Sequence, residues 1–321
     1  MVYFTIIFVS FVIAASFTGP LVFVFFTLIY PVLYLANVYF RRKRLNSAQP
    51  WSFNEKVILI TGASSGIGKS LAHLCVKNGA NVIICARRDE MLSNVAEECR
   101  KINDSVKVLK VKCDIANESE VSQMFEIIKT TFDRLDCIIL NAGVSMGEQF
   151  EDTDYSIIKK IMDINYFGST NVTHKALPLL KNNKKSRILV VNSIIGIIPI
   201  PLRTGYAASK FALRGFFESL QSELWKDEIF ITMAYPGSVR TEINQNRLGS
   251  NPRELDLSDA VSSEECARIL IEGISRGDKE ILFTNRDKLI RLIEGVYPEL
   301  LAYFAYAKAK KHVDLDRNKN Q

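Results

Sequence analysis

The 321-residue chain lacks several features that would point to a metal or disulfide-bonded protein. Its six cysteines form no CxxC pair. Cys85, Cys113 and Cys137 lie in apolar, β-branched runs, so small buried thiols are favoured over a zinc site or a disulfide framework. The three histidines are too few and too scattered for a metal cluster. We therefore expect no metal cofactor.

Charge is missing from one end of the chain. Residues 1–40 contain no charged side chain, and Arg41, Arg42, Lys43 and Arg44 follow directly. Without these four, the 41 lysines and arginines fall to 37, against 35 aspartates and glutamates. The net charge of +6 therefore reflects mainly one basic cluster beside an apolar segment, and it gives no argument for nucleic-acid binding.

The uncharged segment is long enough to cross a membrane. About 20 apolar residues span a bilayer core, so residues 1–40 could form one long pass or two passes bent at Gly19-Pro20. A cleaved signal peptide fits poorly, because it would begin with Lys or Arg and have a shorter apolar core. We expect residues 1–44 to be a membrane anchor with a basic flank, and the basic cluster favours a cytosolic catalytic domain. Three Asn-x-Ser/Thr sequons argue the other way; they begin at Asn103, Asn117 and Asn171.

From residue 56 the sequence alternates between short apolar runs and longer stretches with helical spacing. The predicted strands are Val57–Ile60, Val82–Cys85, Val106–Val111, Cys137–Leu140, Ile188–Val191 and Ile229–Ala234. The predicted helices include Met91–Lys101, Val121–Phe132, Ile157–Leu180 and Phe211–Trp225. Continuous apolar strands separated by helices predict a parallel sheet covered on both faces. The fold class is therefore α/β, a doubly wound Rossmann-type sheet, which we assign to one catalytic domain at residues 45–286.

The C-terminal part carries no recognisable motif. We expect residues 242–286 to form a mobile region on the substrate side, and residues 287–321 to form an amphipathic helix and a polar tail. Within the latter, Leu289–Ala309 spaces apolar and aromatic residues helically. A core helix is the default interpretation; a dimer face and a helix lying on the membrane surface are the alternatives.

The first predicted strand runs into a glycine-rich turn. Gly62 permits a tight turn, Gly66 lets backbone N–H groups approach a pyrophosphate, and Gly68 lets the next helix pack close to the strand. A turn of this kind between a strand and a helix predicts a dinucleotide site. The cofactor-binding residues expected here are Gly62, Ser64, Ser65, Gly66, Ile67 and Gly68.

The end of the second predicted strand bears on which dinucleotide is bound. An NAD site usually has an acidic residue near this point, which holds the ribose 2′-hydroxyl. Here Ala86 is followed by Arg87 and Arg88, whose guanidinium groups suit a 2′-phosphate. The sequence therefore favours NADP(H) over NAD(H).

A catalytic arrangement is predicted around Tyr206. Tyr206 and Lys210 are four residues apart at the start of a helical stretch, so they share one helix face. A nearby ammonium stabilises a phenolate and lowers the pKa of a tyrosine from about 10, as a proton donor to a carbonyl requires. Ser193 ends the fifth predicted strand, 13 residues before Tyr206, where parallel sheets bind ligands.

Together these motifs resemble those of the short-chain dehydrogenase/reductase family. The match runs through Thr61–Gly68, Asp114, Asn141-Ala142-Gly143, Asn165, Ser193, Tyr206, Lys210 and Pro236–Thr241. The resemblance implies that Tyr206 is the general acid/base and that Ser193 orients the substrate carbonyl. It also implies that Lys210 holds the nicotinamide ribose and that Asn165 holds a water in a proton relay. Further cofactor contacts are implied for Asp114, Asn141, Ala142, Gly143, Pro236, Gly237, Val239 and Thr241, in addition to Tyr206 and Lys210.

A closer likeness, in Val191–Ile198 and Ala212–Phe217, is to a membrane-anchored group within this family. That likeness implies an endoplasmic reticulum membrane enzyme that uses NADP(H) to interconvert a carbonyl and an alcohol on a lipophilic substrate, such as a steroid or retinoid. Its expected partners are that substrate, membrane lipid and a possible second copy of the chain. The alternatives are a reductase of a lipid ketone of the 3-ketosphinganine type and a non-catalytic NADP-binding scaffold.

Overall fold

The structure is a computed structural model that describes residues 25–29, 31–32, 35–36, 50–242, 247–249, 260–304 and 306–307. The chain divides into two compact units, Met1–Pro50 and Trp51–Gln321. Most of the expected anchor lies outside the described residues, which include the short π-helix Phe25–Ile29. Among the helices that are described, none combines the length and apolar character needed to cross a membrane.

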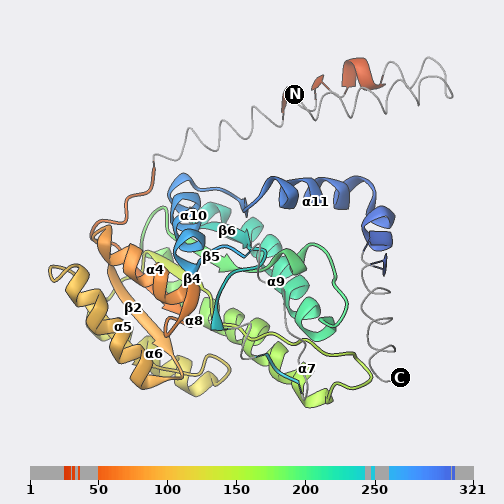
Figure 1. Ribbon diagram of the computed structural model, residues 1–321. Coiled ribbons are helices and arrows are strands. Elements are labelled where there is room, and N and C mark those ends of the chain that lie inside the picture. The colour runs from red at the N-terminus through yellow and green to blue at the C-terminus, as the bar shows by residue number, and fades with distance from the viewer. Residues whose placement is uncertain are drawn as a thin grey trace. The chain divides into compact units, whose positions relative to one another are not determined.

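The second unit is built on a parallel sheet in the order β3-β2-β1-β4-β5-β6-β7 (Figure 1). Its strands are β1 Val57–Thr61, β2 Asn81–Ala86, β3 Val108–Lys112, β4 Cys137–Leu140, β5 Arg187–Val191, β6 Phe230–Tyr235 and β7 Glu280–Leu282. The six predicted strands are confirmed to within two residues at each end. The chain order runs outward in both directions from β1 and β4, which is the doubly wound arrangement expected.

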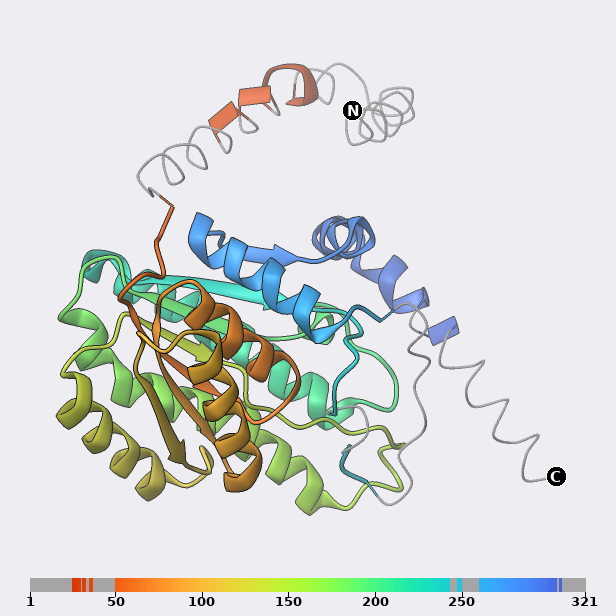
Figure 2. The same ribbon diagram turned by 60° about the vertical axis from the view of Figure 1, so that its left-hand side comes forward.

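Helices cover both faces of this sheet (Figure 1, Figure 2). They are α4 Gly66–Lys77, α5 Asp89–Ile102, α6 Glu118–Phe132, α7 Tyr155–Met162, α8 Ser169–Lys181, α9 Thr204–Glu223, α10 Ser263–Arg276 and α11 Asn285–Val296. Side chains alternate along β1, so Ile58 and Ile60 join one apolar cluster with α4, α5 and α10. Val57 and Leu59 join the other cluster with α6, α8 and α9. The strands are apolar throughout because both of their faces are buried.

All six cysteines are free and buried within these clusters, as the sequence predicted. Burial raises the pKa of each thiol, and that of Cys99 rises to about 12. Thiols of this kind pack as small apolar groups and are poor nucleophiles.

The helix predicted at Ile157–Leu180 is interrupted in the structure. It consists of α7, a π-helical segment Asp163–Gly168, and α8. Gly168 allows this interruption to pack closely, because a Cβ there would lie 2.8 Å from Cγ1 of Ile115. The wider turn holds Asn165 buried between α7 and α8.

The expectation of a mobile region at residues 242–286 is wrong for residues 263–282. Helix α10 packs against α4, and β7 pairs with β6 and extends the sheet. The helix begins at Ser262, whose hydroxyl accepts a hydrogen bond from the Glu265 N–H, and ends at Gly277 with φ +73°. This segment is therefore part of the hydrophobic core.

The default interpretation of Leu289–Ala309 as a core helix is also wrong. Helix α11 ends at Val296, and Leu289 and Leu292 are 44% and 37% exposed. Farther along, Tyr303 and Phe304 are 65% and 57% exposed. The helix contacts the rest of the unit through Ile290, which packs against an apolar cluster, and through ion pairs such as Arg291 to Glu280 at 3.2 Å. A dimer face and a membrane-surface helix remain the alternatives.

Candidate active site

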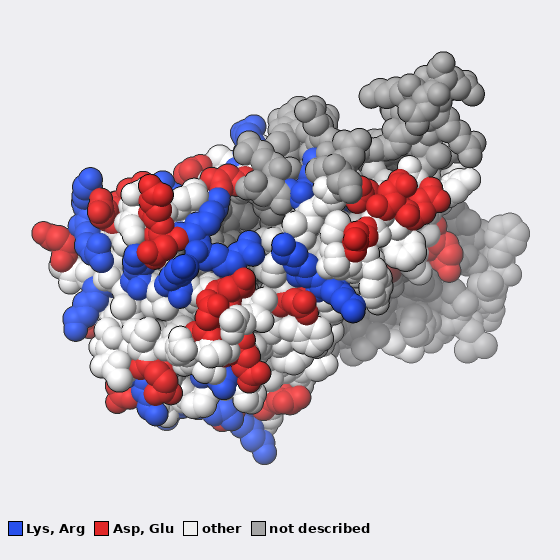
Figure 3. Space-filling view, turned by 90° about the horizontal axis from the view of Figure 1, so that it is seen from below, with Lys and Arg blue, Asp and Glu red and all other residues white. Residues whose placement is uncertain are grey.

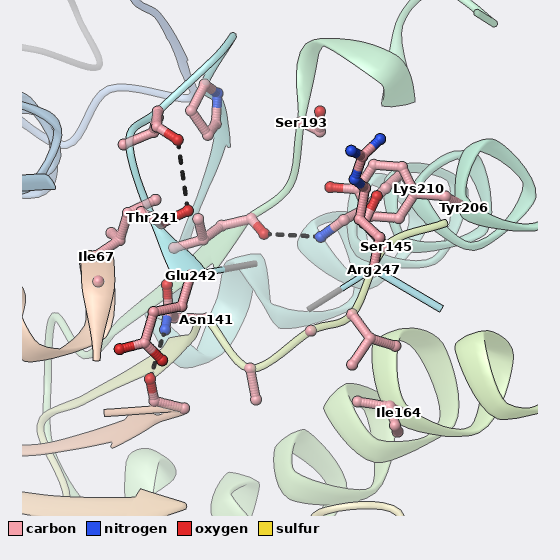
Figure 4. A pocket seen from close by; sticks show the side chains of 18 of the residues that line it. Ile67, Asn141, Ser145, Ile164, Ser193, Tyr206, Lys210, Thr241, Glu242 and Arg247 are labelled. Carbon is pink, nitrogen blue, oxygen red and sulfur yellow. Dashed lines mark hydrogen bonds between the residues drawn. The ribbon is translucent and has the colours of Figure 1, made fainter. Parts of the chain in front are cut away.

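A single cavity of about 1040 Å³ brings the predicted residues together at the carboxyl ends of the strands. It lies where the strand order reverses between β1 and β4, the usual ligand site of such sheets. Of the predicted residues, all except Gly68 and Asn165 line it. Figure 4 shows Ile67, Asn141, Thr241 and Glu242 toward one end, and Ser145, Ser193, Tyr206, Lys210 and Arg247 toward the other.

The turn after β1 has room only for glycine at its key positions. Gly62 and Gly66 have φ values of +66° and +53°, in the left-handed region. A Cβ on Gly62 would lie 2.7 Å from Cα of Ala142, and one on Gly68 would lie 2.3 Å from the Gly62 carbonyl oxygen. Helix α4 then begins after Ser65, which forms no side-chain cap, so the first N–H groups of the helix are available to a phosphate.

Asn141 fixes this turn from the next strand. Its side-chain amide donates hydrogen bonds to the carbonyl oxygens of Thr61 at 3.0 Å and Gly62 at 3.1 Å. The hydroxyl of Thr61 in turn accepts from the backbone N–H groups of Asn141 and Ala142. The two sides of the cofactor-binding cavity are therefore held at a fixed separation.

One guanidinium beside the turn donates hydrogen bonds to three side chains. Arg88 donates to the hydroxyl groups of Ser64 and Ser65 at 3.1 and 2.7 Å, and to the carboxylate of Glu242 at 2.6 Å. The hydrogen bond from Arg88 holds the pKa of Glu242 below its usual range. Arg87 lies 3.9 Å from Asp114. The glycine cradle fits the phosphates of a dinucleotide, and the Arg88 guanidinium beside it can bind an anion.

The catalytic side chains come from the segment that follows β5 and from the first two turns of α9. Tyr206 is only 8% exposed, and its hydroxyl interacts with the side chain of Ser193, which opposes the rise of the Tyr206 pKa. Lys210 is also buried; its ammonium donates to the Val191 carbonyl at 3.1 Å and lies 5.6 Å from the centre of the Tyr206 ring. A proton donor, a second hydroxyl and a cation are thus assembled at one end of the cavity.

The pKa of Tyr206 differs from the sequence-based expectation. Burial raises it above its usual value, and this outweighs the opposing effects of the Ser193 hydrogen bond and the Arg203 charge. The expectation that a nearby ammonium lowers the pKa is therefore wrong for the chain without a ligand. A protonated phenol at neutral pH suits donation of a proton to a substrate oxygen.

Asn165 does not line the cavity, and its contacts are with neighbouring residues that do or that lie in α9. Its side-chain amide donates to the Val144 carbonyl at 3.0 Å and to the Ser209 hydroxyl at 2.9 Å, and it accepts from the Val144 N–H at 2.8 Å. Ser209 in turn donates to the carbonyl of Tyr206. Asn165 therefore clamps the segment after β4 against α9, and its predicted role in a water relay stays a prediction.

Lys210 is expected to make stability depend on pH. Burial lowers the pKa of its ammonium to about 8 from 10.5. Between these values the unfolded chain binds a proton that the folded chain has lost, so unfolding free energy should rise with pH. Denaturant midpoints should therefore rise in this range relative to a Lys210→Met variant. Exposed Lys77 is the control: if Lys77→Met gives the same pH dependence as Lys210→Met, the buried charge is not its source.

Sequence reasoning missed several residues that line the cavity. They are Ser145, Lys160, Ile164, Arg203, Glu242, Arg247 and Leu248, among others. Arg203 had a usable signal, because it lies three residues before Tyr206 and such pairs are neighbours on a helix. Ser145 and Arg247 come from irregular segments, for which the sequence offers no periodicity.

Comparison with known proteins agrees with this geometry. The sequence profile described as short chain dehydrogenase matches residues 56–251. A relative from Arabidopsis thaliana, 11-beta-hydroxysteroid dehydrogenase-like 2, is 36% identical over 288 residues, which cover 88% of this chain and 90% of the relative. Dehydrogenase/reductase SDR family member 7 from Homo sapiens is 31% identical over 249 residues, covering 75% of this chain and 73% of the relative.

Two solved structures share the fold. A short chain dehydrogenase/reductase from Burkholderia phymatum, in complex with NAD, has a TM-score of 0.70 and 21% identity, covering 78% of this chain and 96% of the other. A short chain dehydrogenase from Burkholderia cenocepacia, in complex with NADP, has a TM-score of 0.67 and 24% identity, covering 79% and 99%. The predicted resemblance, including the closer likeness in sequence, is confirmed.

Proposed function

Since this chain belongs to the short-chain dehydrogenase family, we propose that it is a membrane-anchored, NADP(H)-dependent oxidoreductase that interconverts a carbonyl and an alcohol on a lipophilic substrate. The single observation that carries this proposal is the buried Tyr206 side chain, which interacts with Ser193 and has the Lys210 ammonium 5.6 Å from its ring centre. A nicotinamide dinucleotide, when bound, supplies or accepts the hydride.

The side chains of the chain then manage the oxygen and its proton. In the reductive direction, Ser193 and Tyr206 hold the substrate carbonyl oxygen, and the phenol gives its proton to that oxygen. Lys210, held by the Val191 carbonyl, stabilises the phenolate that remains. In the oxidative direction Tyr206 accepts the proton from the alcohol.

The substrate end of the cavity supports an apolar substrate. Val144, Ile164, Ile195, Ile200 and Leu248 line it around the polar catalytic groups, which is the usual composition of a small-molecule pocket. The name of the relative from Arabidopsis thaliana, 11-beta-hydroxysteroid dehydrogenase-like 2, points the same way, toward a steroid.

We further propose that the cofactor is NADP(H), with Arg87 and Arg88 recognising the 2′-phosphate. Arg88 already binds an anion in the structure, the Glu242 carboxylate, together with the hydroxyl groups of Ser64 and Ser65. In this assignment Glu242 occupies the place of the additional phosphate, so the two anions compete for the same guanidinium.

Cofactor preference is expected to change in opposite directions in two variants. Arg88→Ala should lower kcat/KM for NADPH by about 10- to 100-fold, as expected for loss of a charge-assisted contact, and should leave NADH use nearly unchanged. Glu242→Gln should lower the Kd for NADPH, because the competing carboxylate is gone. Arg100→Ala, farther along α5, is the matched control. If Arg88→Ala lowers kcat/KM for NADPH and for NADH equally, Arg88 does not recognise the 2′-phosphate.

For the location, we propose that residues 1–44 anchor the protein in the endoplasmic reticulum membrane with a cytosolic catalytic domain. The apolar segment and its basic flank support this orientation. The asparagines of two sequons make hydrogen bonds within the fold. Asn103 donates to the Val76 carbonyl, and Asn117 caps α6. A glycan would replace a hydrogen on the amide nitrogen, which donates to the Val76 carbonyl in Asn103 and to the Glu120 carboxylate in Asn117, so it would disturb both contacts. In microsomes, a chain that sediments with the membrane and whose body is removed by added protease would support the proposal; a shift on glycosidase treatment would refute it.

The decisive experiment is turnover by the full chain in detergent. NADPH oxidation would be followed with retinal, steroid ketones, quinones and a 3-ketosphinganine analogue, with NADH in parallel. Turnover of one of these with a preference for NADPH supports the proposal, and a clear preference for the sphingoid analogue selects that alternative. NADPH binding with no turnover across the panel would favour a non-catalytic scaffold instead.

A further inference from the structure

A buried guanidinium lies at the substrate end of the cavity. Arg203 directly precedes α9, lines the cavity and is only 8% exposed. Its Nη1 donates a hydrogen bond of 2.6 Å to the hydroxyl of Ser145, which is itself buried. Arg203 lies just outside α9 in a non-helical conformation, and it is close enough to Tyr206 for the two groups to interact electrostatically. This cation therefore lies beside the proton donor.

No carboxylate neutralises this charge within the part of the chain that the structure describes. The pKa of Arg203 is lowered by burial and by the charge of Arg247, and only the neighbouring Tyr206 raises it. No described acidic side chain forms an ion pair with Arg203. Burying a charge without a counter-charge is unfavourable, and a ligand that brings an anion would remove that cost.

A second cation is fixed close to the first. Arg247 is close enough to Arg203 for the two charges to repel, and a Cβ on Gly147 would be 2.6 Å from its Nη1. Figure 4 shows Arg247 toward the same end of the cavity as Tyr206. The segment that carries it is held by the Leu248 N–H, which donates to the Ser145 carbonyl at 2.8 Å. Lys160 adds an exposed ammonium at the rim of the same cavity. These two cations line the same cavity as Arg203, and the buried carboxylate of Glu148 lies next to the segment that carries Arg247.

The charged side chains at this end of the cavity lie among apolar ones. Ile164, Ile195, Ile200, Leu202 and Leu248 line the same end of the cavity. Such a wall excludes water and strengthens the attraction between a guanidinium and an anionic ligand group. A purely apolar ketone would leave Arg203 without a counter-charge, whereas an amphiphile with one acidic group would satisfy both kinds of surface.

We propose that the natural substrate is an oxo acid or hydroxy acid with an apolar tail, and that Arg203 and Ser145 bind its carboxylate. The proximity of Arg203 to Tyr206 places the carboxylate a few bonds from the reacting carbon. This inference rests on the proposed function, because it assigns a substrate class to the same Tyr206-centred site. The reaction is unchanged: hydride is exchanged at the carbonyl carbon and a proton at its oxygen.

The test compares two substrates that differ only in charge. A medium-chain γ-oxo fatty acid and its methyl ester would be reduced by the full chain with NADPH. We expect kcat/KM for the acid to exceed that for the ester by about 30- to 100-fold, the worth of a charge-assisted bidentate contact. Arg203→Met should abolish this preference and Arg203→Lys should keep part of it. Arg214→Met is the matched control, because Arg214 lies on the same helix outside the cavity and pairs with Glu218.

Binding provides a second readout that does not need turnover. In a Tyr206→Phe background with NADP⁺ present, the acid should raise the unfolding temperature more than the ester does, and Arg203→Met should remove the difference. Equal kcat/KM for acid and ester would overturn the proposal. So would an Arg203→Met variant that lowers both alike and shifts the pH profile, since Arg203 would then only tune the Tyr206 pKa. Ketone reduction that depends on Tyr206 but shows no acid preference would leave the proposed function intact and refute this inference alone.

Discussion

Replacing Tyr206 by phenylalanine is expected to lower kcat by about 1,000-fold, within the range of contributions from a positioned general acid. The phenol is the group that can give a proton to the substrate oxygen, and phenylalanine retains the ring without it. Cofactor affinity should change little, because the ring is buried and keeps its packing. The measurement is kcat for the best carbonyl substrate, together with the Kd for NADPH from nucleotide fluorescence.

Tyr235→Phe is the matched control for this variant. Tyr235 is a fully buried tyrosine on β6, and its hydroxyl has no hydrogen-bond partner among the residues that the structure describes. Removing it should leave kcat unchanged and leave stability equal or slightly higher. A Tyr206→Phe enzyme that keeps a tenth or more of its kcat would show that another group donates the proton.

Gly68→Ala is expected to have the largest effect on the cofactor site. The added methyl carbon would lie 2.3 Å from the Gly62 carbonyl oxygen and 2.6 Å from the Asn141 side-chain nitrogen, both of which shape the turn. Either the turn moves or the helix does, so the free energy of unfolding should fall by about 1–3 kcal/mol, the usual cost of overpacking. The displaced turn should also weaken NADPH binding by at least about 100-fold, since the phosphate depends on correctly placed N–H groups.

Alanine at a second glycine is expected to stabilise the protein instead. Gly215 lies in α9, and a Cβ there would have no heavy atom within 4 Å. Gly215→Ala should therefore stabilise the protein by about 0.5–1 kcal/mol through helix propensity alone, with NADPH binding unchanged. Comparing the two variants by chemical denaturation and by cofactor titration separates the steric effect from a general intolerance of alanine. Equal behaviour of the two would contradict the close packing at Gly68.

The parts of the fold that sequence predicted best were those with a strong local pattern. Strands β1, β4 and β5 are continuous apolar runs, because a doubly covered sheet leaves no polar face. The glycine turn was equally clear, since its backbone geometry excludes other residues. Strand β7 was missed because only three residues pair at the sheet edge, and only Ile281 among them is buried.

The residues of the active site likewise fall into those that a local sequence pattern predicts and those that it does not. Tyr206, Lys210 and Ser193 were predictable because their spacing along one strand and one helix fixes their proximity. Asn165 was predicted only from the family resemblance, as the holder of a water, and the π-helical segment that buries it leaves no trace in periodicity. Glu242 and Arg247 approach the cavity from a segment after β6, and Arg88 meets Glu242 across 154 residues of sequence. Contacts of that range follow from tertiary packing rather than from a local pattern.

The position of α10 has a consequence for how the protein is made. The backbone N–H of Trp51 bonds to the Ser275 carbonyl at 2.9 Å, and the Ser275 hydroxyl bonds back to the Trp51 carbonyl, 224 residues away along the chain. The apolar face of α4, including Leu71 and Cys75, is covered by Leu270 and Ile274 of α10. During translation that face stays open until almost the whole catalytic unit has left the ribosome. The nascent chain is therefore expected to need a holding chaperone over most of its synthesis, and to fold in one late step once α10 emerges.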